Sequence, residues 1–400
     1  MSTREFLIVG GLDKQGLVLP EDVRFCTRCV VSNQRPRIVI DDEGVCSACR
    51  FAEEKYQSID WAARESELER LLDKHRRNDG HWDVIVPCSG GKDSAYVAHQ
   101  LKTKYGMHPL TVTWAPFRYT EIGYQNFVSF VDSGFNNIVG YQNGRLHRKL
   151  ARIAFEELGD AWQPFTYGQM CFAFHLALRF KIPLVFFGEN GEAEYGGDPK
   201  NNHKSHMPLE DWALSYFKGA TVDDLVRMGL EHKEYFTEAD FDPADLTFYR
   251  PPPVEQIQAS QTQMHWYSYY HRWIPQENYY YALDHTGFVA NPERSEGTYS
   301  KYASLDDRLD GFHFYLAFIK FGIGRATSDA AHEIRDGHIT REEGVALVRR
   351  CDGEFPAKYL NEFLEYLDIE EEYFWRVVDC YRKPHIWKWD GEWKLKHQVS

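Results

Sequence analysis

The chain has 400 residues, which is enough for two or three domains with hydrophobic cores of their own. Its apolar fraction of 43% and charged fraction of 26% are those of an ordinary globular protein and exclude a disordered, fibrous or collagen-like chain. A formal net charge of −14 argues against non-specific binding to nucleic acid, although it leaves room for a locally basic groove. No apolar run approaches the roughly 18 residues of a membrane span and no secretory signal is recognisable, so we expect a cytoplasmic protein.

Four of the eight cysteines form two Cys-X-X-Cys pairs near the N-terminus. Cys26 and Cys29 are separated from Cys46 and Cys49 by sixteen residues, which include a candidate strand at 37–41. Two pairs at this separation are typical of a zinc ion held by four thiolates, which is a closed and therefore structural site. Iron–sulfur ligation uses the same four thiolates and stays open as an alternative, as do free thiols. Disulfides would require an oxidising compartment.

Residues 83–94 have the pattern of a strand, a small-residue loop and a helix, which aims backbone N–H groups and a helix dipole at an anion. The loop, Ser-Gly-Gly-Lys-Asp-Ser, is not a Walker A motif, because Asp93 stands where that motif needs Ser or Thr. It matches SGGxDS and so resembles the loop of the PP-loop ATP pyrophosphatases, which hold the β- and γ-phosphates there and cut ATP between the α- and β-phosphates. The alternative interpretation is that these residues form an ordinary glycine turn, capped by Ser94, that binds no nucleotide.

The residue types of this loop suit a nucleotide. Gly90 and Gly91 let the backbone approach a pyrophosphate without a Cβ clash. Lys92 can neutralise charge on the leaving pyrophosphate, and Asp93 can hold the Mg²⁺ that bridges phosphates. The predicted ATP-binding residues are Ser89, Gly90, Gly91, Lys92, Asp93, Ser94 and Thr113, of which Lys92 and Asp93 are also predicted to be catalytic.

Strands alternate with helices as far as residue 240. Apolar runs predict further strands at 109–114 and 183–187, and helical patterns cover 124–133, 145–158 and 169–181. This alternation predicts a doubly wound parallel α/β sheet of the PP-loop (adenine-nucleotide α-hydrolase-like) type, with ligands at the carboxyl ends of its strands.

An acidic turn at 188–197 follows the strand at 183–187. Glu189 and Asn190 lie at this carboxyl end, and we predict that both are catalytic. Such a turn can bind metal, polarise an amide or guide ammonia; the alternative is a solvated acidic turn.

The second half is aromatic-rich and mainly helical. Thr340 and Glu343 predict a capping box, and the aromatic stretch at 266–281 is assigned chiefly to packing, with a carbohydrate platform as the alternative. Two interpretations stay open for a group of charged residues: they face the ligand crevice of the sheet, or they are solvated charges on amphipathic helices. That group comprises Lys301, Asp306, Asp307, Asp310 and Arg325. The predicted regions are a Cys₄ zinc module at 1–60, a PP-loop domain at 61–240 and a helical region at 241–400.

Almost the whole chain resembles the bacterial N-acetyl-sugar amidotransferases of lipopolysaccharide O-antigen and nonulosonic acid biosynthesis. The resemblance rests on the four cysteines, on VPCSGGKDS (86–94), KYGMHPLTVTW (104–114) and GENGEAEYGG (188–197), and on the segments 300–315, 318–344 and 352–360. It implies that the acetamido group of an N-acetylated, nucleotide-linked sugar becomes an acetamidino group through an O-adenylyl imidate and ammonia, with release of AMP and pyrophosphate. ATP, Mg²⁺ and Zn²⁺ are the expected cofactors.

The source of ammonia is expected to lie outside the chain. An N-terminal-nucleophile glutaminase needs Cys as its second residue, and Ser2 stands there; a fused triad glutaminase would need about two hundred residues more. The resemblance implies a separate HisH-like glutaminase, sometimes with a HisF-like subunit, and we place the end of an ammonia channel near Glu189–Glu194.

Two other functions are weighed against this one. PP-loop tRNA thiolases also combine SGGxDS with cysteine motifs, but they need a basic surface, which the net charge of −14 disfavours. A non-catalytic scaffold would not need the intact Ser-Gly-Gly-Lys-Asp-Ser loop.

Overall fold

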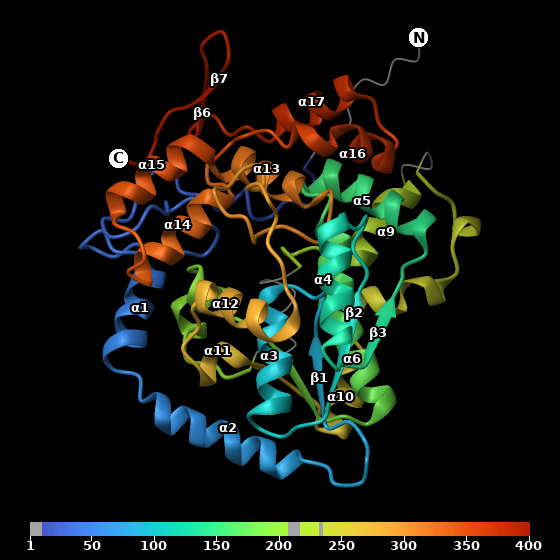
Figure 1. The fold of residues 1–400 in the computed structure, drawn as a ribbon. Helices are drawn as coiled ribbons and strands as arrows, with labels where there is room; N and C mark the ends of the chain where they lie inside the picture. The colour runs from blue at the N-terminus through green and yellow to red at the C-terminus, as the bar shows by residue number, and fades with distance from the viewer. Residues whose placement is uncertain (1–9, 207–216, 232–234) are drawn as a thin grey trace.

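The computed structural model describes residues 10–206, 217–231 and 235–400, so Ser2 lies outside the described part (Figure 1). At its centre is a parallel sheet of five strands in the order β3-β2-β1-β4-β5. The strands are β1 (Val84–Pro87), β2 (Pro109–Trp114), β3 (Asn137–Gly140), β4 (Leu184–Phe187) and β5 (Gln263–Trp266).

Helices cover both faces of this sheet because its side chains alternate between two cores. Ile85 and Val185 belong to the core formed with α5 (Gly144–Leu158), α6 (Gln163–Phe180) and α9 (Val222–Glu231). Val84 and Val86 belong to the opposite core, with α2 (Trp61–His75), α3 (Lys92–Thr103), α4 (Glu121–Asp132) and α12 (Pro275–Thr286). The predicted doubly wound α/β fold is confirmed.

The C-terminal helices form a separate layer, drawn at the top of Figure 1 above the sheet. A third core, which includes Phe312, Phe363 and Phe374, holds this layer against α5. The predicted capping box is present, since Thr340 and Glu343 bond reciprocally at the start of α15. The elements of the layer are α13 (Asp310–Phe321), α14 (Arg325–Arg335), α15 (Arg341–Cys351), α16 (Leu360–Leu367), α17 (Glu371–Cys380) and the hairpin of β6 (Trp387–Trp389) and β7 (Trp393–Leu395).

The sheet differs from the sequence-based expectation in two strands. β5 comes from beyond residue 240, so the predicted boundary between the PP-loop domain and the helical region divides the sheet. β3 was not expected either, since its four residues are too few for a periodic pattern. The expected strand at 37–41 is reduced to a single bridge between Ile40 and Cys46.

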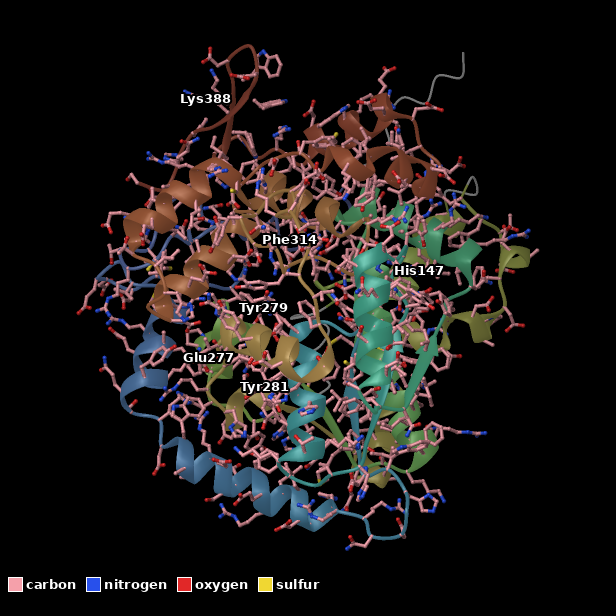
Figure 2. All side chains as sticks on the ribbon, in the orientation of Figure 1. His147, Glu277, Tyr279, Tyr281, Phe314 and Lys388 are labelled. Carbon is pink, nitrogen blue, oxygen red and sulfur yellow. The ribbon has the colours of Figure 1, made fainter. Side chains whose placement is uncertain are left out.

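The aromatic stretch at 266–281 serves chiefly for packing, as expected. Tyr267, Tyr270 and Trp273 are fully buried in the core around α3. The stretch contains α11 (Tyr267–Tyr270) and begins α12, on which Tyr279 and Tyr281 are labelled in Figure 2. α10 (Val254–Ser260) precedes it.

None of the helices in the described residues has both the length and the apolar character needed to cross a bilayer.

Candidate active site

The glycine loop and the acidic turn meet where the strand order of the sheet reverses. β1 has β2 on one side and β4 on the other, and a crevice forms outside the carboxyl ends of strands at such a point. Residues 88–94 follow β1 and residues 188–194 follow β4, so both segments flank this crevice.

The first glycine of the loop is required by the fold itself. Gly90 has a φ of +87°, and a Cβ there would lie 2.5 Å from Cα of Phe127 on α4. Gly91 caps α3 from an extended conformation, and a Cβ there would meet only the Ser89 hydroxyl, at 3.5 Å. The first N–H groups of α3 are therefore presented at an uncluttered turn, an arrangement that fits a phosphate oxygen.

Two of the predicted ATP-binding hydroxyls hold the loop in shape. Ser94 Oγ donates to the Gly91 carbonyl at 3.1 Å, and Thr113 Oγ1 contacts the Cys88 carbonyl at 2.5 Å. Both residues line the crevice, and their contact with a phosphate stays a prediction.

Lys92 and Asp93 form an ion pair at the start of α3. Asn278 on α12 donates to the other carboxylate oxygen of Asp93 at 2.9 Å, which fixes the orientation of that side chain. The Lys92 ammonium also lies 5.8 Å from the ring centroid of Tyr302. Both charges predicted to act on ATP thus face one crevice, and the helical half of the chain orients them.

Glu189 lies opposite this pair, in the turn after β4. Burial, together with the negative charge of Asp93, raises the pKa of Glu189 to about 7. Its carboxylate accepts a hydrogen bond of 3.4 Å from the hydroxyl of Tyr195. Glu189 is thus a carboxyl group that can exchange a proton near neutral pH inside the crevice.

The other polar residues of the acidic turn form hydrogen bonds and ion pairs within the protein. Asn190 caps α7 (Gly191–Glu194), and its amide nitrogen donates to the Asn201 carbonyl at 2.9 Å. Glu192 pairs with Arg37, and Glu194 pairs with the buried Lys55 at 3.1 Å. Asn190 is therefore a helix cap, and its catalytic role stays a prediction. Glu189 is the acidic side chain of the turn that lines the crevice.

The C-terminal region supplies the remaining wall of the crevice. Ser89 Oγ donates to Asp306 at 2.8 Å, and Asp307 accepts hydrogen bonds from the backbone of Phe117 and Leu309. Burial raises the pKa of Asp310 above its usual value. Four of the five charged residues whose position the sequence left open line the crevice: Asp306, Asp307, Asp310 and Arg325. The fifth, Lys301, lies at the surface, where its ammonium donates to the carbonyl of Pro292.

The crevice encloses about 480 Å³, within the range of about 300–1,000 Å³ that takes one small-molecule ligand. Its charged lining contains more acids than bases: Asp93, Glu189, Asp306, Asp307 and Asp310 against Lys92 and Arg325. Such a lining alone repels a triphosphate. A Mg²⁺ ion prefers carboxylate and phosphate oxygens and offsets that repulsion, so the donor set fits a Mg²⁺–nucleotide.

Sequence reasoning missed three residues of this site. Asn278 lies in the aromatic-rich half, where no motif marks it, and Tyr302 lies in the segment 300–315, which carries the resemblance but gives this residue no role. Tyr195 lies within the acidic motif, yet its part is visible only because the turn folds its hydroxyl back onto Glu189.

The four N-terminal cysteines form one buried cluster whose ligand atoms all lie within 4.8 Å of one another. The Sγ atoms of Cys26 and Cys49 are 3.8 Å apart, and those of Cys29 and Cys46 are 3.7 Å apart. Four sulfurs at about 2.3 Å from one tetrahedral ion are separated by about 3.8 Å, so this donor set fits a single ion. In a cluster of several irons the four thiolates are divided between different iron atoms, so some of them must lie further apart than these sulfurs do.

The module around these cysteines holds the acidic turn at 188–197 in place. Arg35 Nε donates to the carbonyl of Gly196 at 2.7 Å, and Ser47 Oγ donates to that of Gly197 at 3.2 Å. The ion pairs of Glu192 and Glu194 described above also connect the turn to this module. The cysteine module thus supports the backbone on which Glu189 stands.

Sheet order, glycine loop and crevice together define an α/β protein of the PP-loop type. Residues 296–400 match the family model of the C-terminal domain of WbpG-like lipopolysaccharide (LPS) biosynthesis proteins. The resemblance predicted from the sequence is thereby supported. Among solved structures, an NH₃-dependent NAD synthetase from Campylobacter jejuni aligns with 16% identity and a TM-score of 0.27, over 50% of this chain and 95% of the synthetase chain. No curated protein matches the sequence.

Proposed function

We propose that the protein is an ATP-dependent amidotransferase that converts an acetamido group of an N-acetylated, nucleotide-linked sugar to an acetamidino group in bacterial surface polysaccharide biosynthesis. One observation carries the proposal: the glycine loop and the region of the WbpG-like LPS biosynthesis domain line the same crevice. Ser89 and Lys92 come from the loop, whereas Asp306 and Arg325 come from the matched domain. The nucleotide-binding and family-specific parts therefore act on one set of ligands.

The chemistry requires activation of a poor electrophile. The amide oxygen attacks the α-phosphorus of ATP, the bond to the β-phosphate oxygen breaks, and pyrophosphate leaves. Ammonia then adds to the imidate carbon, and AMP departs with the former amide oxygen. A Mg²⁺ ion held by Asp93 and the phosphates would supply charge neutralisation.

The side chains of the crevice have separate parts in this scheme. Lys92 neutralises charge on the departing pyrophosphate, and Asn278 keeps Asp93 oriented. Glu189, whose pKa of about 7 allows it to accept a proton, takes one from the attacking ammonia. We further propose that the four-cysteine site holds zinc in a structural role, that the protein is cytoplasmic, and that a separate HisH-like glutaminase supplies the ammonia.

A tRNA-thiolating enzyme is the weaker candidate. Cys88 is the cysteine that lines the crevice, and burial raises the pKa of its thiol to about 12. A thiol in that state is a poor nucleophile and a poor sulfur carrier.

The proposal is tested by mass spectrometry of diacetamido sugar nucleotides incubated with the protein, ATP, Mg²⁺ and ammonium. The expected product is one mass unit lighter than the substrate, because NH replaces O, and AMP forms in equal amount. Glutamine should be inert with the protein alone. Pyrophosphate release without a lighter sugar, or glutamine use by the lone chain, would contradict the respective parts of the proposal.

A further inference from the structure

A second cavity of about 370 Å³ lies directly behind the nucleotide crevice. The two share the side chains of Tyr195, Phe314 and Arg325, which form the wall between them. Figure 2 labels Phe314 near the middle of the molecule, on the layer of C-terminal helices. A ligand in one cavity is therefore within reach of a ligand in the other.

The second cavity is basic although the protein is acidic. Its charged and titratable lining consists of one acid, Asp160, and six bases: Arg35, Arg37, Lys218, His313, Lys320 and Arg325. Most of these bases are paired within the fold, as Arg37 is with Glu192 and Lys320 with Asp13. A lining of this composition favours an anionic ligand.

Arg35 is the base without a carboxylate partner in the described part of the chain. Its Nε donates to the Gly196 carbonyl at 2.7 Å, while no described residue accepts a hydrogen bond from its two terminal nitrogens. Its guanidinium carbon lies 5.6 Å from the ring centroid of Tyr195. A half-buried guanidinium with two free N–H edges is suited to grip a carboxylate or phosphate.

Arg325 belongs to the wall between the two cavities and lines both of them. Its Nε donates to Asp329 at 3.0 Å, and its guanidinium carbon lies 4.6 Å from the ring centroid of Phe314. Arg35 and Arg325 are therefore both fixed through Nε and an aromatic ring, and both line the second cavity. Rigid placement lowers the entropic cost of binding an anion there.

The volume of the crevice also argues for a second binding site. The crevice of about 480 Å³ suits one ligand of nucleotide size, so a sugar nucleotide cannot share it with ATP. An acceptor anchored in the second cavity could extend past Tyr195 and bring its acetamido group to Glu189, which Tyr195 contacts.

We propose that the second cavity binds an oxyanion of the acceptor substrate, either a phosphate of its nucleotide carrier or a carboxylate of its sugar, with Arg35 as the main anion-binding residue. This inference rests on the proposed amidotransferase function for the identity of the acceptor. The anion site itself follows from the cavity and its lining.

The test is isothermal titration calorimetry on the whole protein, with the nucleotide site saturated by Mg²⁺ and an ATP analogue carrying a methylene bridge between the α- and β-phosphates. UDP-N-acetylglucosamine probes the phosphate source, glucuronate probes the carboxylate source, and neutral N-acetylglucosamine is the blank. We expect one charged probe to bind, more weakly as salt rises, and the blank not to bind. Whichever charged probe binds more tightly identifies the source.

Arg35→Gln is the decisive variant, because its amide can still donate to Gly196 while the charge is lost. We expect at least a tenfold weaker binding of the charged probe and unchanged binding of the ATP analogue. Arg148→Gln is the matched control, since Arg148 donates to the carbonyls of Tyr366 and Glu365 outside this cavity. Thermal unfolding of each variant checks that it is folded.

Two results would overturn the inference: neither charged probe binds the wild type, or Arg35→Gln binds the probe as tightly as the wild type does. Failure of the proposed function would look different. In that case the charged probe binds in an Arg35-dependent manner, yet no acetamido sugar is converted to a lighter product.

Discussion

Ser89 in the glycine loop donates a hydrogen bond of 2.8 Å to Asp306, 217 residues further along the chain. The contact connects the nucleotide loop to the first part of the WbpG-like domain. The region matched by that family model therefore lines the same crevice as the glycine loop. The glycine loop contributes Ser89 and Lys92 to this crevice, while the later region contributes Asp306 and Arg325.

This contact predicts that Asp306 is needed for turnover rather than for stability. Asp306→Asn should lower kcat for pyrophosphate release by about tenfold, because it loosens the Ser89 hydroxyl that the carboxylate orients in the glycine loop. Asp284→Asn, which alters an exposed carboxylate on α12, should leave the rate unchanged. Equal rates for both variants would show that the Ser89–Asp306 contact has no part in the reaction.

Asp93 should be indispensable. Asp93→Ala removes the proposed Mg²⁺ ligand and leaves Lys92 without its ion-pair partner, so AMP formation should be abolished. Asn278→Ala should reduce AMP formation more mildly, by about tenfold, because it loosens the orientation of Asp93. Full activity of the Asp93 variant in a chromatographic AMP assay would refute the proposed mechanism.

Glu189 should make both stability and activity depend on pH. Its pKa is raised from 4.5 to about 7 by burial and by Asp93, so the folded chain binds a proton that the unfolded chain releases. The free energy of unfolding therefore falls as pH rises through this window. Glu189→Gln removes the effect, and the variant should gain about 3 kcal/mol over the wild type at pH 8 and little at pH 4.5.

Differential scanning fluorimetry across this pH range measures that gain, and the same variant should lose amidine formation. Glu255→Gln, on an exposed carboxylate, is the control for stability. A Glu189 variant whose melting temperature follows that of the wild type at every pH would contradict the raised pKa.

The cysteine cluster should hold one metal ion per chain. Cys46→Ser should lower the zinc content measured by plasma mass spectrometry and lower the melting temperature by several degrees, since binding of a structural metal adds to folding free energy. Because the module also holds the turn of Glu189, activity should fall with metal content. Cys380→Ser, on an exposed cysteine outside the cluster, should change neither quantity.

Local sequence was sufficient for several features of the protein. Gly90 could be identified because few residues other than glycine fit a tight turn between a strand and a helix. The two Cys-X-X-Cys pairs could be identified because each pair forms its own local turn. Long helices and apolar strands such as β2 were visible from their periodicity. Short segments such as the strand β5 could not be recognised in this way, because four residues are too few to show a periodic pattern.

The sequence alone indicated a four-cysteine module, a loop of the PP-loop type, and the alternating strands and helices of an α/β protein, because each of these patterns is carried by residues close together in the chain. Tertiary structure alone decided which side chains form the site. It joined Asp306 to Ser89, turned Asn190 into a cap, committed Glu192 and Glu194 to ion pairs, and placed Arg35 beside Tyr195. These outcomes depend on contacts between distant segments, whose geometry is set by packing of the whole molecule and leaves no periodic trace in the chain.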